Sequence, residues 1–289
     1  MQKGSALIFV LWIIAILTII ASEIGFNSRL NSYLAVYEAN SIKNYPAILS
    51  CLNNGLKVVL SQNASELTHL TGSTFEFSLK EPEYTCELSF YDESGRYNIN
   101  KATEKELLNI LSSIGIEGEK KDTIVDSILD WRDSDDFHRL NGAESDYYES
   151  LNPPYKCKNG DLNSIYELTL IKGIDLEVYK KLKNIFTIYS NAGKININSA
   201  TKEVLITLGI DEDIVNKILK EREGGPFLDM DDLQSRIEGI DIVDLENKIT
   251  FKDSGIYKTI VKITHGGDIS TGKFILKISP SGAEILDVI

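Results

Sequence analysis

The sequence has few of the residues that carry covalent and metal chemistry. Its 289 residues include three cysteines and three histidines. Three cysteines are too few for a disulfide-stabilised scaffold, and so few histidines argue against a zinc enzyme. His69, His138 and His265 are scattered, without a nucleophile or a metal ligand at catalytic spacing, and no glycine-rich phosphate loop follows an expected strand. The sequence therefore predicts a protein that is not an enzyme.

Positive charge is also scarce. Lys and Arg total 30 against 43 Asp and Glu, which gives a formal net charge of −13. Non-specific nucleic-acid binding comes mostly from Lys and Arg that neutralise phosphates, so this balance argues against a general nucleic-acid binder. Hydrophobic residues make up 43% of the chain, which is enough to build a sizeable core and excludes a disordered chain.

One long apolar run stands near the N-terminus. Residues 5–21 carry no charge, and a helix of that length rises about 25 Å, just short of the roughly 30 Å hydrocarbon core of a bilayer. Apolar residues continue beyond it at three- and four-residue steps, so we predict one helix over residues 5–62, transmembrane over residues 5–21. A cleaved secretory signal peptide is the alternative, but Ala21-Ser22-Glu23 is a poor cleavage site.

The remainder predicts an α+β fold in which helices interrupt an antiparallel sheet. Strands are expected wherever apolar and polar residues alternate, in Phe75–Leu79, Tyr84–Tyr91, Ile256–Thr264, Lys273–Ser279 and Ala283–Ile289. The segment between the second and third of these is almost wholly helical. The simplest arrangement is a β domain of residues 63–94 and 246–289 with an α domain, residues 95–245, inserted into it.

The α domain contains an internal repeat with a period of roughly a hundred residues. Tyr97–Thr103 corresponds to Ile195–Thr201, and the second helix of each copy ends near an arginine, Arg132 or Arg222. The threonine that closes each repeated segment is expected to cap the following helix. Ser164–Gly173 repeats part of the outline once more.

With their glycine turns and the segment Gly225-Pro226-Phe227, these modules resemble helix-hairpin-helix units. Many such units bind DNA non-specifically, because backbone amides of the hairpin coordinate phosphate. Here carboxylates such as Glu117 and Asp211 stand where phosphate would approach, and like charges repel. The pattern therefore favours hairpins that serve packing over hairpins that bind DNA.

The densest group of carboxylates follows the first module. Asp133-Ser134-Asp135 resembles the start of a calcium loop, Gly142 permits a sharp turn, and Trp131, Tyr147 and Tyr148 indicate that the segment is packed. Packed carboxylates repel unless a cation compensates them, and hard oxygen ligands favour Ca²⁺ over zinc. A solvated charged face is the alternative. The candidate ligands are Asp130, Asp133, Asp135, Asp136, Glu144 and Asp146.

Two parts of the chain resemble the minor pseudopilin K family of type II secretion. Lys3-Gly4 followed by Ser5-Ala6-Leu7-Ile8 is similar to the class III signal of type IV pilins, and Phe9 replaces the glutamate that most of those proteins carry, a departure characteristic of minor pseudopilin K. The second part is the order of six motifs: Asp130–Asp136, Gly142–Tyr148, Leu151–Tyr155, Lys158–Gly160, Ser164–Ile174 and Gly193–Ala200.

The resemblance implies a pilin-like fold, structural calcium in the α domain, cleavage between Gly4 and Ser5 by a prepilin peptidase, and methylation of the new N-terminus. It also implies a single-pass inner-membrane protein whose C-terminal domain is periplasmic. Such a protein would assemble with minor pseudopilins I and J at the tip of the pseudopilus, to initiate or cap the fibre for protein export. The alternatives are a membrane-anchored helix-hairpin-helix protein for DNA binding or uptake, and a minor pilin of a related type IV pilus.

The chemistry of the cysteines depends on the compartment. Cys51 lies on the long helix and is expected to be a small buried apolar residue. In an oxidising periplasm Cys86 and Cys157 are candidates for a disulfide, and the sequence leaves that pairing open.

Overall fold

The computed structural model describes residues 44–61, 70, 74–80, 83–190 and 193–289. The predicted cleavage site at Gly4 and Ser5, Phe9 and the predicted transmembrane residues 5–21 lie outside this part of the chain. The predicted N-terminal helix is described over residues 44–60. None of the helices within the described residues is both long enough and apolar enough to cross a membrane.

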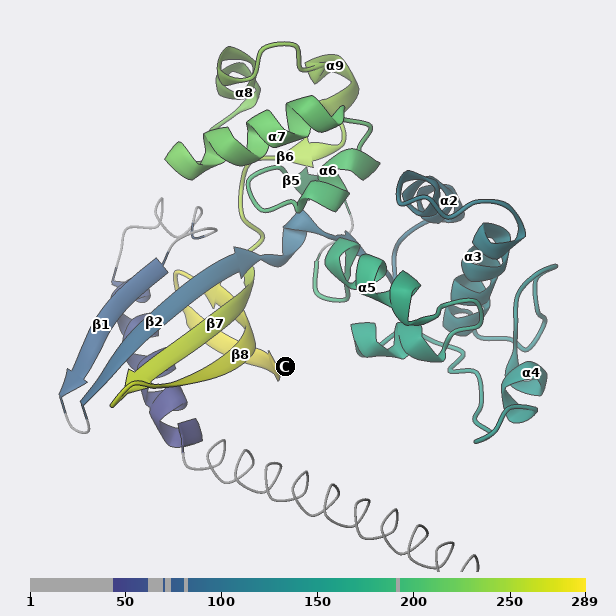
Figure 1. Ribbon diagram of the computed structural model, residues 1–289, viewed down its shortest axis with the longest axis horizontal. Helices are drawn as coiled ribbons and strands as arrows, with labels where there is room; N and C mark the ends of the chain where they lie inside the picture. Colours follow the sequence, from purple (N-terminus) through teal and green to yellow (C-terminus); the bar gives the residue numbers. More distant parts are fainter. Residues whose placement is uncertain (1–43, 62–69, 71–73, 81–82, 191–192) are drawn as a thin grey trace, which may run out of the picture.

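The β domain is one antiparallel sheet of five strands in the order β1-β2-β7-β8-β9 (Figure 1). The strands are β1 (Thr74–Lys80), β2 (Glu83–Asp92), β7 (Ile256–His265), β8 (Asp268–Ser279) and β9 (Gly282–Val288). β2 and β7 are neighbours, with Asp92 opposite Tyr257, although the whole helical segment separates them in sequence. This confirms the predicted sheet with helices inserted into it.

The N-terminal helix covers one face of the sheet. Alternate residues of β2 and β7, such as Leu88 and Val261, point to that face and are buried, as the period of two in a strand requires. The helix contributes residues at helical spacing, among them Leu52 and Val59. Gly55 allows the close approach, since a Cβ there would lie 2.4 Å from Leu88 Cδ2.

A disulfide joins this helix to the sheet. Cys51 pairs with Cys86 of β2, with their Cα atoms 5.8 Å apart, and both residues are fully buried. Cys157 is a buried free thiol. The Cys86–Cys157 pairing that the sequence left open is therefore wrong, because Cys86 faces the N-terminal helix while Cys157 lies in the core of the inserted domain.

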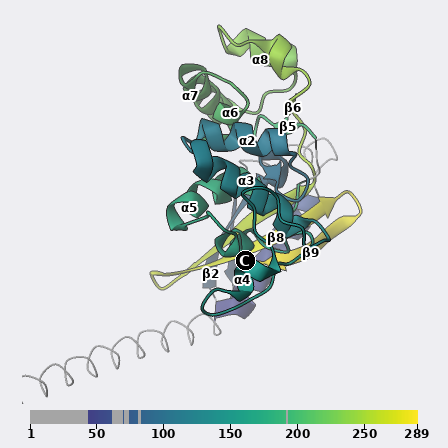
Figure 2. The same cartoon turned by 90° about the vertical axis from the view of Figure 1, so that its right-hand side faces the viewer.

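The inserted domain has its own hydrophobic core. In Figure 1 helices α6–α9 lie above the sheet and α2–α5 lie to its right, and Figure 2 again shows α6, α7 and α8 at the top. The elements in chain order are η2 (Glu93–Gly95), β3 (Tyr97–Asn98), α2 (Glu104–Ser113), α3 (Gly118–Arg132), α4 (Ser145–Glu149), η3 (Ile165–Leu170), α5 (Leu176–Ile185), β4 (Phe186–Thr187), β5 (Ile195–Asn196), α6 (Lys202–Thr207), α7 (Glu212–Glu221), η4 (Arg222–Gly224), α8 (Met230–Arg236), α9 (Ile242–Leu245) and β6 (Ile249–Thr250).

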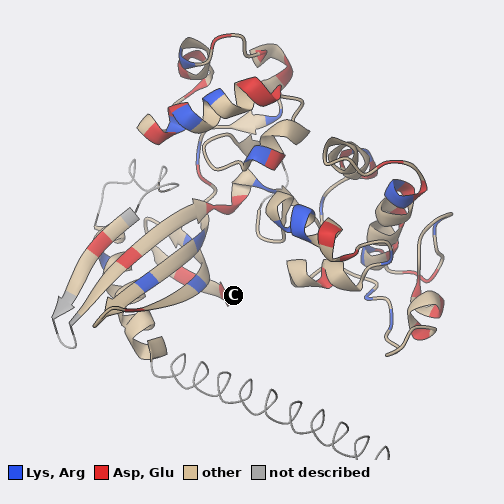
Figure 3. Cartoon of the chain, viewed as in Figure 1, with Lys and Arg blue, Asp and Glu red and all other residues tan. Residues whose placement is uncertain are grey.

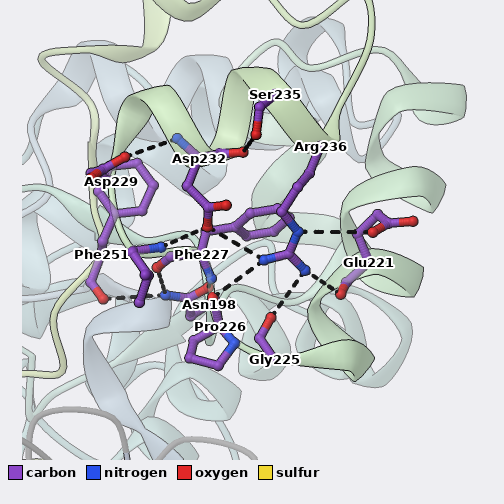
Figure 4. Close-up of polar contacts among 11 residues, drawn as sticks. Asn198, Glu221, Gly225, Pro226, Phe227, Asp229, Asp232, Ser235, Arg236 and Phe251 are labelled. Carbon is purple, nitrogen blue, oxygen red and sulfur yellow. Dashed lines mark hydrogen bonds and ion pairs between the residues drawn. The ribbon is translucent and has the colours of Figure 1, made fainter.

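The internal repeat is also a repeat of contacts. Asn100 forms two hydrogen bonds with the backbone of Leu162, accepting from its amide at 2.8 Å and donating to its carbonyl at 2.9 Å. Asn198 does the same with Phe227, at 2.8 and 2.9 Å (Figure 4). Arg222 likewise donates to two backbone carbonyls just before α6, as Arg132 does before α2.

Both expected helix caps are present. The side chain of Thr103 accepts from the third amide of α2, and that of Thr201 from the third amide of α6. Each module also forms a short parallel strand pair, β3 with β4 and β5 with β6. Because β6 pairs with β5, the second module continues past residue 245, where the sequence placed the boundary of the α domain.

Candidate metal centre

The predicted acidic loop returns on itself so that its two ends meet. α3 ends at Arg132, so Asp130 lies in its last turn and Asp133 is its C-cap residue. Glu144 immediately precedes α4 and occupies its N-cap position, but its side chain makes no capping hydrogen bond. Carboxylates fourteen residues apart in sequence, Asp130 and Glu144, are thereby brought together.

Three carboxylates converge within this loop. Asp130, Asp133 and Glu144 each offer an oxygen atom, and these atoms all lie within 4.8 Å of one another. Asp130 has 0% and Glu144 1% of its surface exposed. At these separations ionised carboxylates repel strongly, and burial removes the water that would screen them.

Several buried oxygen atoms of this group accept no well-formed hydrogen bond within the described residues. They are both carboxylate oxygens of Glu144, Oδ1 of Asp133 and Oδ1 of Asn159, and Glu144 lies beside the weakly donating thiol of Cys157. An unpaired buried polar atom costs free energy comparable to a lost hydrogen bond, and an unpaired charge costs more. A cation bound by these oxygens would remove that cost, so the residues present fit a metal ion.

The protonation equilibria reflect the same crowding. Burial, together with the smaller contributions of the charges of Asp130, Asp133 and Asp136, raises the pKa of Glu144 to about 7, and the contact with the Cys157 thiol opposes this rise. Burial likewise raises the pKa values of Asp130 and Asp133. The negative charge of Asp133 contributes to the rise at Asp130. A cation would reverse these shifts, because it stabilises the ionised carboxylates that it binds.

The other three predicted ligands are exposed and make contacts of their own. Asp135 accepts the amide of Phe137 at 2.9 Å, and Asp146 accepts the amide of Tyr147 at 2.7 Å. Asp136 Oδ1 accepts from Ser145 at 3.3 Å and from Asn159 at 3.0 Å. The structure thus brings together three of the six candidate residues and leaves these three outside the cluster.

Gly142 shapes the cluster by being small. A Cβ atom at this position would lie 1.9 Å from Oδ2 of Asp130. The sequence predicted that Gly142 permits a sharp turn, but its backbone does not enter the left-handed region. The residue is needed because the chain passes directly against the Asp130 carboxylate.

Sequence reasoning missed Asn159 and underrated Cys157. Asn159 is a non-glycine residue with positive φ, at 51°, and its side-chain amide donates to the carbonyl of Asp135 at 3.1 Å. The pair Asn159-Gly160 was a usable signal, because Asn tolerates the left-handed conformation in turns. The thiol of Cys157 lies 3.8 Å from the carbonyl oxygen of Asp130, and burial raises its pKa to about 12.

In some hairpins a carboxylate of the protein occupies the backbone amides that a phosphate would need. Left-handed glycines mark four of them, at Gly115, Gly173, Gly209 and Gly239, of which the last was not predicted from the sequence. In two hairpins the following aspartate accepts the amides that open the next helix, Asp175 at 2.9 and 3.0 Å and Asp241 at 3.1 and 3.4 Å. Lys and Arg are interspersed with Asp and Glu along these helices (Figure 3).

The last hairpin also explains the predicted Gly225-Pro226-Phe227 segment (Figure 4). The guanidinium of Arg236 lies 4.3 Å from the ring centre of Phe227 and donates to the carbonyls of Gly225 and Pro226 at 3.1 and 3.3 Å. Asp232 receives both the amide of Leu228 and the guanidinium of Arg236. The segment is therefore a packed turn whose polar groups are satisfied within the protein.

Comparisons with known proteins assign the chain to a family. Two family models, both described as type II secretion system (T2SS) protein K, match residues 87–191 and 195–252. Together they span more than half of the chain. The type II secretion system protein K of Pectobacterium carotovorum subsp. carotovorum is 27% identical over 226 residues, 70% of this chain and 67% of that protein. A putative type II secretion system protein K of Escherichia coli K12 is 26% identical over 227 residues, with the same two shares.

A solved structure has the same fold. The crystal structure of the GspK-GspI-GspJ complex from the enterotoxigenic Escherichia coli type 2 secretion system contains a chain that matches with a TM-score of 0.66 at 18% identity. The match covers 87% of this chain and 98% of that chain. The match supports the mixed arrangement of helices and antiparallel sheet.

Proposed function

The chain belongs to the family of type II secretion system protein K, the minor pseudopilins K, and we propose that it stands at the tip of the pseudopilus in a complex with minor pseudopilins I and J. The observation that carries this proposal is the large helical domain inserted between β2 and β7, since the family match covers that domain. A structural match to a chain from a complex of GspK, GspI and GspJ supports the choice of partners. The role is structural and not catalytic.

The N-terminal residues complete this proposal. A prepilin peptidase would cut between Gly4 and Ser5, and residues 5–21 would anchor the chain once in the inner membrane with the described domains in the periplasm. The Cys51–Cys86 disulfide supports that compartment, because disulfides persist in oxidising surroundings. Phe9 leaves no carboxylate for a further subunit, and the bulky insertion would block stacking, as a cap or initiator requires.

The test of the assembly is co-purification of the full-length chain with minor pseudopilins I and J from detergent-solubilised membranes. We expect a stable complex with all three chains in a single gel-filtration peak. A variant that lacks the inserted domain is the matched control for the role of the N-terminal helix. Three separate peaks, under conditions in which each chain remains folded, would contradict the proposed role.

We further propose that Asp130, Asp133 and Glu144 hold a structural Ca²⁺ ion. Hard carboxylate oxygens match the preference of calcium, and the unpaired buried oxygens of Glu144 and Asp133 support a cation at this point. The ion would neutralise the buried charge and tie the end of α3 to the start of α4. Residues in those two helices would then keep one arrangement instead of repelling each other.

Terbium luminescence on the full-length chain in detergent tests this proposal, because Tb³⁺ replaces Ca²⁺ in oxygen sites and Trp131 directly follows Asp130. We expect sensitised emission that calcium displaces and that Glu144→Gln weakens at least tenfold, since it removes a ligand charge. Glu149→Gln, an exposed neighbour on α4, is the matched control. Equal emission from both variants would exclude Glu144 as a ligand.

A further inference from the structure

Lys172 connects the hairpin at Gly173, called here the second hairpin, to the acidic loop. It lies between η3 and α5, and its Nζ donates to the carbonyl of Gly142 at 2.9 Å and to that of Asn141 at 3.2 Å. The same ammonium lies 5.1 Å from the centre of the Tyr147 ring. Within the described part of the chain Lys172 forms no ion pair, so its charge is directed at carbonyl groups and an aromatic face.

The two carbonyls belong to the segment that completes the carboxylate cluster. Gly142 passes directly against the Asp130 carboxylate, and Glu144 follows two residues later. From the other side, Asp126 of α3 accepts the backbone and side-chain amides of Asn141 at 3.0 and 3.1 Å. Residues 141–144 are therefore held at a fixed distance from Asp130 by α3 and by the second hairpin together.

A second contact strengthens this connection. The backbone amide of Lys172 donates to the hydroxyl of Tyr148 at 3.3 Å, and Tyr148 belongs to α4, the helix that directly follows Glu144. Tyr148 packs against Trp131, with ring centres 5.2 Å apart, beside Asp130. Both ends of the Lys172 residue thus contact the part of the chain that carries the third carboxylate.

We propose that Lys172 is the positioning residue of the metal centre: it holds residues 141–144 so that Glu144 meets Asp130 and Asp133 before the ion binds. This inference rests on the proposed calcium site. Groups that orient ligands in advance raise affinity, because binding of the ion then does not have to order the loop as well. The cation also becomes coupled to the second hairpin, since both stabilise the same conformation of the loop.

The direction in which calcium affinity changes when Lys172 is replaced distinguishes a positioning role from simple charge repulsion. A lysine near a cation site repels the cation, so removing its charge alone should strengthen calcium binding. If Lys172 positions the loop, the same removal weakens binding. The two explanations therefore predict opposite changes for one substitution.

The experiment compares Lys172→Met, Lys172→Arg and Lys120→Met in the full-length chain in detergent. Lys120 is the matched control, because it pairs with Asp175 near the same hairpin and does not touch the acidic loop. Calcium affinity is measured by displacement of Tb³⁺, and the melting temperature is measured separately in EDTA. We expect Lys172→Met to bind calcium about 10–100-fold more weakly, Lys172→Arg to retain most of the affinity, and Lys120→Met to be unchanged.

The outcomes are distinguishable. Lys172→Met that binds calcium as tightly as the wild type, or more tightly, overturns the positioning role while leaving the calcium site intact. A wild-type chain that binds neither Tb³⁺ nor Ca²⁺ overturns the calcium site itself. If Lys172→Met does not fold, Lys172→Gln keeps a donor without the charge, and its affinity relative to Lys172→Arg decides the question in the same way.

Discussion

Loss of the Cys51–Cys86 disulfide is expected to lower the free energy of unfolding of the β domain by about 3–4 kcal/mol. The two cysteines are 35 residues apart, and opening a loop of that size returns substantial conformational entropy to the unfolded chain. The bond is also the covalent link between the N-terminal helix and β2, whose contact forms the core of this domain. For a chain of this size the loss corresponds to a fall in melting temperature of roughly 6–15 °C.

The measurement is thermal unfolding with and without a reductant that acts on the buried bond. The double variant Cys51→Ala with Cys86→Ala should melt early in both conditions, whereas Cys157→Ala should keep the response of the wild type, because Cys157 is a free thiol. Alkylation of the denatured, unreduced wild type should modify one cysteine. Modification of all three, or a melting temperature that does not respond to complete reduction, would show that the bond is absent or without effect.

This disulfide marks the limit of what the sequence predicts about the fold. Alternation in Phe75–Leu79 and Tyr84–Tyr91 was enough to predict β1 and β2, because a strand with one buried face must alternate. Which residue of the helix meets Cys86 depends on how the helix crosses the sheet. That crossing is set by packing at Gly55 and Leu88, which local periodicity does not report.

For the metal centre, too, the sequence predicted the region but not the exact contacts. The sequence indicated the loop and its carboxylates, and Asp130, Asp133 and Glu144 were among the six residues named. It could not separate them from Asp135, Asp136 and Asp146, because neighbouring residues of an irregular loop have no fixed period. The choice is made by Gly142, which brings the returning chain against Asp130, and by Asn159, which holds the carbonyl of Asp135.

The internal repeat was easier to predict, and the reason is physical. Asn100 and Asn198 each hydrogen-bond both backbone groups of a buried residue that is distant in sequence, Leu162 or Phe227. Such paired hydrogen bonds require the same side chain at the same place in each copy, so the repeat is visible in the sequence. The residues that they bind, Leu162 and Phe227, are distant in sequence and of different types, so the sequence does not reveal them.

Removal of the bound cation is expected to destabilise the α domain increasingly as the pH rises. Without a cation, the folded-state pKa of Glu144 is about 7, above its ordinary value of 4.5, so the folded chain retains a proton that the unfolded chain has lost. Stability is then full below about pH 4.5 and falls as the pH rises towards 7, by on the order of 3 kcal/mol. The raised pKa values of Asp130 and Asp133 act in the same direction.

Calcium reverses this dependence, because the ion binds the ionised carboxylates and competes with protons for them. The measurement is the melting temperature in EDTA and in excess Ca²⁺ at about pH 5 and about pH 8. EDTA should lower it by roughly 6–12 °C at the higher pH and much less at the lower one. Glu144→Gln should remove most of the pH dependence in EDTA and most of the response to calcium, whereas Glu149→Gln should change neither. An EDTA effect of equal size at both pH values would show that the ionised Glu144 does not hold the ion.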